Sequence, residues 1–113
     1  LAGSAAITLR SLLSSHPEMI DVRYGEQAVP PRARIERAMA TTRERIARSA
    51  SPVDDGLLLA YLGHLTGDRA AIQEGLSHVK GKPQDETLRQ LLEKIWLAPD
   101  AKPGIEPAAA SAP

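Results

Sequence analysis

Residues 56–76 read GLLLAYLGHLTGDRAAIQEGL and form the most apolar stretch of the chain. A leucine-rich run from Leu57 to Leu65 is followed by Gly67-Asp68 and then by a second, amphipathic run. Gly67 suits the left-handed conformation that ends helices, and Asp68 can cap the helix that follows. The stretch therefore predicts a helix, a tight turn and a returning helix. The first of these helices is apolar almost all round, so we expect it to be covered on several sides.

Composition supports a helical fold and narrows the function. The 113 residues suffice for one domain with a single core, and they include no Phe, one Trp and two Tyr. Leucine, isoleucine, valine and alanine must then build the core, which favours helices over sheets. Fourteen basic and fourteen acidic residues cancel, which argues against general affinity for nucleic acids or acidic membranes. The absence of cysteine excludes disulfides and thiolate metal sites.

No apolar run approaches the ~18 residues of a membrane span, so we expect no membrane insertion by this segment. The chain begins with Leu1 rather than methionine, which suggests part of a larger protein. Its compartment cannot be read from the sequence. The organisation that we predict is a short helix and loop over residues 1–30, a helical domain over residues 31–97 and a flexible Ala/Pro-rich tail over residues 98–113.

The flanking elements follow from standard helix signals. Residues 4–15 predict a short helix that Ser4 can cap. An irregular link follows, where Ile20, Val22 and Tyr24 alternate with polar residues but a strand would lack a partner. Before the leucine-rich helix, Ser51 is expected to cap and Pro52 to occupy the first position. Asp85 or Thr87 is expected to open a last helix, whose apolar face carries Leu88, Leu91, Leu92, Ile95 and Trp96.

The longest predicted helix, residues 31–48, carries six arginines against two glutamates. Its apolar face carries Ile35, Met39, Thr42 and Ile46 at helical spacing. The plainest interpretation of the arginines is a solvated surface. The alternative is a basic docking surface that includes Arg37, Arg43 and Arg48.

The stretch from Gly67-Asp68-Arg69 to Ala71-Ile72 resembles the turn of a tetratricopeptide repeat (TPR), a pair of antiparallel helices that stacks into solenoids. Leu59 and Ala60 stand where this family packs a large and then a small residue, and Pro83 lies near its closing proline. Arg69 replaces the family's usual aromatic residue. The resemblance implies an all-α fold of antiparallel hairpins, with about four to five helices in a right-handed TPR-like stack.

The TPR resemblance also implies a concave face lined by exposed positions of the first helix. Asp54, Leu57, Tyr61, His64 and Leu65 occupy those positions, with Tyr61 and His64 as the preferred contact residues. The competing interpretation makes Leu57 and Tyr61 part of the core. Gly75, in the second helix, is expected to allow close approach of the two helices.

Catalytic and metal-binding patterns are absent from the sequence. His16, His64 and His78 do not have the spacing of a metal site, and the acidic pairs Asp54-Asp55 and Asp85-Glu86 stand at helix starts, where the helix dipole explains them. We therefore expect no enzyme activity, no cofactor and no metal. The leading expectation is a protein–protein interaction module that binds a protein or peptide through a helical groove.

Two alternatives remain open at this stage. The first is a domain that self-associates through an exposed apolar face around Trp96. The second is nucleic-acid binding by the arginine-rich helix 31–49, which is disfavoured because that helix has no lysine and no aromatic residue for stacking.

Overall fold

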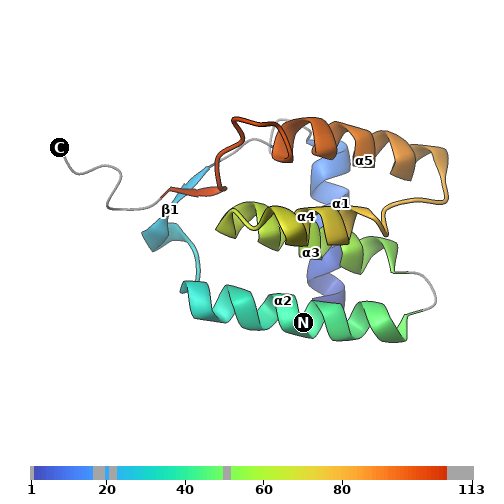
Figure 1. The fold of residues 1–113 in the computed structure, drawn as a ribbon. Coiled ribbons are helices and arrows are strands. Elements are labelled where there is room, and N and C mark those ends of the chain that lie inside the picture. Colours follow the sequence, from blue (N-terminus) through green and yellow to red (C-terminus); the bar gives the residue numbers. More distant parts are fainter. Residues whose placement is uncertain (1, 17–19, 21–22, 50–51, 107–113) are drawn as a thin grey trace.

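The computed structural model describes residues 2–16, 20, 23–49 and 52–106. Within these residues the fold is all-α, with five α-helices and one pair of two-residue strands (Figure 1). No helix among them is long and apolar enough to cross a membrane. In chain order the elements are α1 (Ala2–Ser15), β1 (Tyr24–Gly25), a 3₁₀ helix (Glu26–Ala28), α2 (Arg32–Arg48), α3 (Val53–Thr66), α4 (Arg69–Leu76), α5 (Pro83–Trp96) and β2 (Ile105–Glu106).

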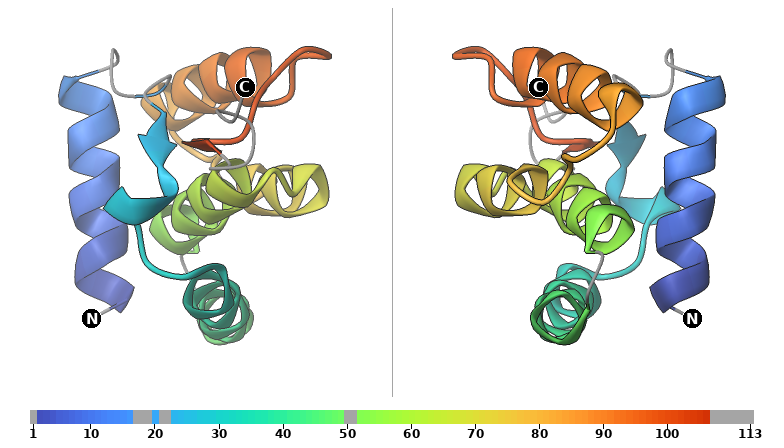
Figure 2. Two further views of the ribbon diagram at one scale, coloured as in Figure 1. Left: turned by 90° about the vertical axis from the view of Figure 1, so that its left-hand side faces the viewer. Right: turned by 90° about the vertical axis from the view of Figure 1, so that its right-hand side faces the viewer.

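Helices α2 to α5 run back and forth, so that each is antiparallel to the next, and α1 lies across them (Figures 1 and 2). Helix α3 is central, because α1, α2 and α4 all pack against it. Leu57, Leu59 and Ala60 of α3 are fully buried. The predicted central position of the leucine-rich helix is confirmed.

The turn between α3 and α4 forms as the sequence predicts. Gly67 adopts a left-handed φ of 74°, and the Ala71 N–H donates a hydrogen bond of 3.1 Å to the Asp68 carboxylate. Two glycines then allow the helices to touch. A Cβ atom on Gly75 would lie 2.4 Å from the Gly56 carbonyl oxygen and 2.5 Å from the Ala60 nitrogen. The expectation that Gly75 allows close approach is confirmed.

Two predicted caps differ in the structure. Helix α1 begins at Ala2, so Ser4 lies inside the helix rather than at the position before its first residue. Pro52 is itself the N-cap of α3 rather than its first helical residue, and its carbonyl accepts the Gly56 N–H at 2.7 Å. The proposed cap Ser51 falls outside the described residues.

The N-terminal helix belongs to the same core as the residues that follow it. Leu9, Leu13 and Ile20 are buried in one cluster with Leu57 and Trp96. The described part of the N-terminal segment therefore shares one core with α3 and α5. The reason is that the apolar surface of α3 extends around the helix, and α1 covers the part that α2 and α4 leave open.

The expected flexible tail does not hold for residues 98–106. β2 pairs in parallel with β1, so that Tyr24 faces Ile105, and it provides the partner that the alternating segment around Tyr24 was expected to lack. Gly104 makes this possible because a Cβ there would lie 2.9 Å from the imidazole of His64 and from a methyl group of Leu65. Residues 107–113 lie outside the described residues.

The returning segment also completes the C-terminal end of α3, where helix carbonyls have no partner within the helix. The Gly104 N–H donates to the His64 carbonyl at 2.8 Å, and the Asp68 N–H donates to the Gly63 carbonyl at 2.8 Å. A guanidinium nitrogen of Arg32 donates to the Thr66 carbonyl at 3.2 Å. Three separate parts of the chain thus meet at this helix end.

Candidate functional site

The residues that the TPR resemblance places on an exposed groove are mostly buried. Leu57, His64 and Leu65 are almost inaccessible to solvent, and Tyr61 is half-buried. The physical reason is that α1 and the segment 98–106 cover the surfaces of α3 that a repeat would leave open. The expectation of an exposed groove at these positions is therefore wrong, and the competing interpretation of Leu57 as a core residue is confirmed.

His64 and Tyr61 instead form an aromatic cluster with Trp96. The rings of His64 and Trp96 stack with their centroids 4.8 Å apart, and those of Tyr61 and Trp96 are 6.1 Å apart. The Trp96 indole N–H donates to the Ile20 carbonyl at 3.0 Å. Burial raises the pKa of Tyr61 far above its ordinary value, and the nearby Tyr24 hydroxyl raises this pKa further. The cluster therefore ties the last helix to the core.

The described residues contain no group of three or more histidines and carboxylates that could hold a metal ion. His64 packs in the aromatic cluster. The Asp54 and Asp85 carboxylates, which stand in the first turns of two different helices, are both bound by one arginine. Within the described residues, the His64 imidazole and the Asp54 and Asp85 carboxylates thus make contacts that hold helices together.

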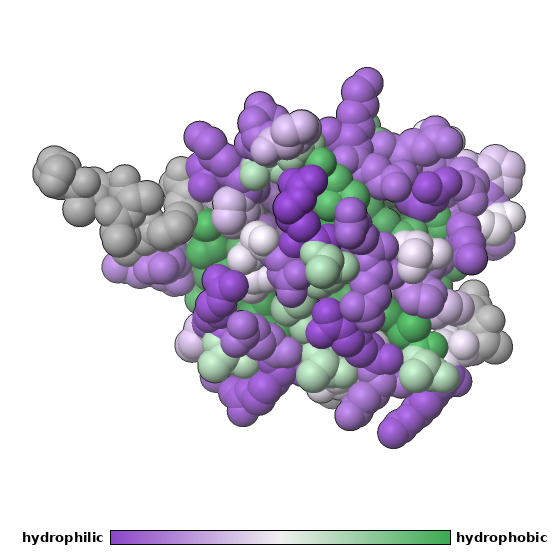
Figure 3. All heavy atoms as spheres, viewed as in Figure 1, coloured by the Kyte–Doolittle hydropathy of each residue, from purple (hydrophilic) through white to green (hydrophobic). Residues whose placement is uncertain are grey.

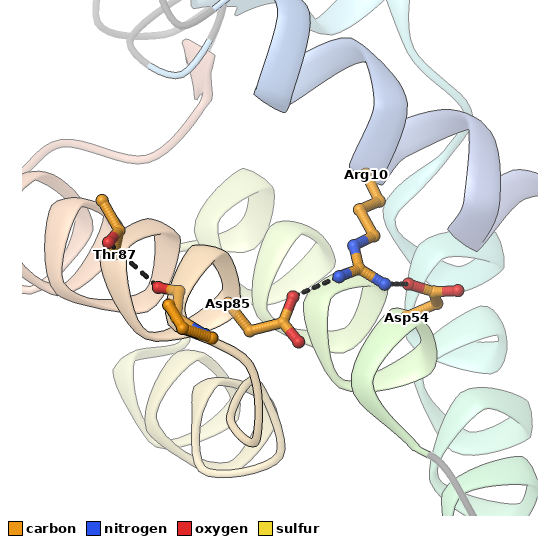
Figure 4. Close-up of polar contacts among 5 residues, drawn as sticks. Arg10, Asp54, Asp85 and Thr87 are labelled. Atoms are coloured by element: carbon orange, nitrogen blue, oxygen red, sulfur yellow. Dashed lines mark hydrogen bonds and ion pairs between the residues drawn. The ribbon is translucent and has the colours of Figure 1, made fainter.

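That arginine is Arg10, the one charged residue in the sequence of α1. Its guanidinium donates to Asp54 at 2.9 Å and also to Asp85, so that one side chain joins α1, α3 and α5 (Figure 4). Asp85 is only 3% exposed. Burying a carboxylate is costly unless it is paired, and Arg10 supplies the pairing.

The start of α5 explains why Asp85 is available for this contact. The helix begins at Pro83, so neither Asp85 nor Thr87 opens it as the sequence suggested. Asp85 stands in the first turn, and the Thr87 hydroxyl donates to the Pro83 carbonyl at 3.0 Å (Figure 4). Asp85 thus serves both the helix dipole and the ion pair to Arg10.

The three arginines predicted as a basic docking surface do not act together. The Arg43 guanidinium nitrogen Nε lies 3.0 Å and 3.1 Å from the two carboxylate oxygens of Glu74, which links α2 to α4. Arg37 and Arg48 are exposed and make no ion pair within the described residues. Because Arg43 is paired with Glu74, the candidate basic surface consists only of Arg37 and Arg48. These two arginines lie about three helical turns apart.

We expect the substitution Arg43→Met to lower the free energy of unfolding by less than about 1 kcal/mol. The pair with Glu74 is solvent-exposed, and exposed ion pairs contribute little because water and salt screen them. Urea denaturation of the variant and of the wild-type protein measures the difference. A loss above about 2 kcal/mol would mean that this link carries much of the α2–α4 contact.

A pocket of about 380 Å³ opens at the C-terminal end of α3. Figure 3 shows apolar residues reaching the surface beside the strand pair, whereas the face made by α2, α4 and α5 is largely polar. Six of the nine lining residues are apolar, and three of these six are prolines. The lining residues are Glu26, Val29, Pro30, Pro31, Arg32, Leu65, Thr66, Pro103 and Ile105.

The rim of this pocket carries charge and backbone hydrogen-bonding groups. Arg32 is held there by its bond to the Thr66 carbonyl, and its Nε lies 3.6 Å from the Glu36 carboxylate. The Tyr24 N–H donates to the Gly104 carbonyl at 2.7 Å. In a parallel ladder this turns the N–H and C=O of Ile105 away from β1. Since the sheet has two strands in the described part of the chain, that edge of β2 is unpaired.

Of the predicted partner-binding residues, only Leu65 lines this pocket. The site could not be recognised from sequence patterns because its lining comes from three separate segments, residues 26–32, 65–66 and 103–105, none of which carries a pattern that marks a pocket. The available signal was the concentration of prolines at positions 30, 31 and 103 beside single aliphatic residues. Prolines restrict the backbone at these two places in the chain. The sequence does not show that the two places lie side by side in the fold.

No protein-family model matches this chain, and comparisons with curated proteins and with solved structures found no significant match.

Proposed function

We propose that this domain is a non-catalytic protein–protein interaction module that binds an extended peptide segment of a partner protein in the pocket at the end of α3. The observation that carries the proposal is the pocket of about 380 Å³, whose apolar lining adjoins the charged Arg32. Peptide-binding sites combine such apolar recesses with a few polar groups that fix orientation. The proposed partner is therefore a protein with an exposed, extended segment whose side chains fit this pocket.

The chemistry of the pocket defines the peptide. Val29, Pro30 and Pro103 offer rigid apolar walls that suit an aliphatic or proline side chain. Arg32 favours a carboxylate next to that side chain, because guanidinium groups bind carboxylates with two parallel hydrogen bonds. The unpaired edge of β2 favours an extended backbone, which can add beside a strand by main-chain hydrogen bonds.

We further propose that α3 and α4 form a TPR-like hairpin that acts as the scaffold of this site. The close approach at Gly56 and Gly75, the left-handed Gly67 and the buried Leu59 and Ala60 support this part of the proposal. In a TPR the ligand lies on the first-helix face. Here the ligand would bind at the end of that helix, since α1 and residues 98–106 cover the face itself.

Selection of peptides from a random linear-peptide display library tests the proposal. We expect the 113-residue chain to select peptides that share an aliphatic or proline residue beside an acidic one. A selected peptide should bind Arg32→Glu at least about tenfold more weakly than wild type, which corresponds to ~1.4 kcal/mol. Val29→Asp should have a similar effect, because it places a charge on the apolar wall.

The matched control is Arg37→Glu, which makes the same change of charge on the same helix but away from the pocket. It should bind the selected peptides as the wild-type protein does. Failure to select any peptide would overturn the proposal, and so would peptides that bind all variants equally. Circular dichroism of each variant establishes that it remains folded. Substitutions of Tyr61 or His64 are unsuitable here, since both side chains pack in the aromatic cluster.

A further inference from the structure

The outward face of α1 has an unusual composition for the surface of this chain. Three large apolar side chains are exposed in the described residues: Ile7 at 62%, Leu12 at 39% and Leu91 at 37%. Ile7 and Leu12 both belong to α1. Figure 2 shows that α1 stands at the edge of the helix stack, with one side facing no other helix.

This face also lacks charge. One quarter of all residues in the chain are charged, yet the one charged residue of α1 is Arg10, which binds Asp54 and Asp85 in the interior. Charged residues are depleted at the centres of protein interfaces and enriched on solvated surfaces. The solvated face of an ordinary surface helix would carry several charges. The composition of α1 is therefore that of a covered helix.

The described part of this face has the ridges and grooves of a surface on which another helix can pack. Its side chains form two rows at i, i+4 spacing, one of Ile7, Ser11 and Ser15 and one that joins Thr8 to Leu12. They line a shallow depression of about 480 Å³ that ends at His16. The large Ile7 and Leu12 side chains act as ridges, and the small hydroxyl residues between them leave grooves.

We propose that this face is a homodimer interface, in which α1 packs against α1 of a second copy of the chain. A two-fold contact places the same patch against itself, so a face with charges of one sign would repel its copy. A face without charge brings no like charges together when it meets its copy, and Ile7 and Leu12 of each copy can fill the grooves beside Ser11 of the other. The dimer contact does not depend on the proposed peptide site.

The interface replaces the self-association surface that the sequence suggested. Trp96 is only 1% exposed, because it packs in the aromatic cluster, so the last helix presents no apolar face around it.

The length of α1 limits the area that the dimer can bury, and so its affinity. Its 14 residues span about 21 Å, and a single helix pair of that length buries less than the ~800 Å² per partner of stable complexes. We therefore expect a reversible dimer with a dissociation constant in the micromolar range.

Sedimentation equilibrium of the 113-residue chain over a range of concentrations up to about 1 mM tests the interface. Wild type should show a monomer–dimer equilibrium. Ile7→Glu and Leu12→Glu each place a charge on the contact and should raise the dissociation constant at least about tenfold. Both side chains are exposed in the monomer, so neither change should unfold it.

Leu91→Glu is the matched control, since Leu91 has nearly the same exposure as Leu12 but lies on α5. It should dimerise as wild type does. A wild-type protein that stays monomeric throughout the concentration range would overturn the proposal. An equal effect of Leu91→Glu and Leu12→Glu would overturn it as well, because the association would then not be specific to α1.

Discussion

Replacing Gly75 with alanine is expected to lower the free energy of unfolding by about 3 kcal/mol. The new Cβ would lie 2.4 Å from the Gly56 carbonyl oxygen and 2.5 Å from the Ala60 nitrogen, and both are backbone atoms of α3. A backbone atom cannot move aside without moving its helix, so the α3–α4 contact must open. The better helix propensity of alanine offsets only about 1 kcal/mol of this cost. Urea denaturation monitored by circular dichroism measures the loss.

Gly25→Ala is the control for this prediction. A Cβ added at Gly25 would have no atom within 4 Å, and the residue has an ordinary negative φ of −69°. We expect this variant to unfold within about 0.5 kcal/mol of wild type. If Gly75→Ala were as stable as Gly25→Ala, the close contact between α3 and α4 would be refuted.

Arg10→Met is expected to lower the free energy of unfolding by about 3 kcal/mol. Methionine keeps much of the apolar stem, so the change mainly removes the guanidinium that binds Asp54 and Asp85. Asp85 is then left buried without its partner, which is the costly part of breaking such a pair. Arg10 is partly exposed, so solvent screening places the effect at the low end of the range for buried pairs.

A double-mutant cycle with Asp85→Asn separates the ion pair from other roles of Arg10. In the Asp85→Asn background, Arg10→Met should cost at least about 1 kcal/mol less than in wild type, because no buried carboxylate remains to be stranded. Arg37→Met, a change at an exposed arginine, should cost less than about 0.5 kcal/mol. Equal losses for Arg10→Met and Arg37→Met would contradict the role of Arg10 as a link between three helices.

The local features of the fold could be predicted from the sequence because each rests on a few neighbouring residues. The leucine run of α3 implies burial on several sides, Gly67-Asp68 encodes the turn, and Gly75 stands out in a helix where only a close contact explains it. The apolar positions of α2 likewise give its buried face, on which Ile35 and Met39 are buried. None of these features depends on a distant part of the chain.

The features that could not be predicted depend on contacts between distant segments. The apolar pattern of α3 predicts that other elements cover this helix, but it does not identify them. The covering by α1 and by residues 98–106 was therefore missed. β1 and β2 have two residues each and lie about 80 positions apart, so neither has a recognisable pattern alone. The assignment of Tyr61 and His64 to an exposed groove failed for this reason, and the pocket beside β2 was missed with it.

Nuclear magnetic resonance mapping of one selected peptide on the 113-residue chain tests the proposed function most directly. We predict that the peptide shifts the backbone amide signals of Arg32, Thr66 and Ile105 and slows hydrogen exchange at the Ile105 amide, which faces the unpaired edge of β2. The signals of Ile7 and Leu12 on α1 should remain unchanged. Perturbations confined to another surface, with no change at Ile105, would contradict a peptide-binding pocket at the end of α3.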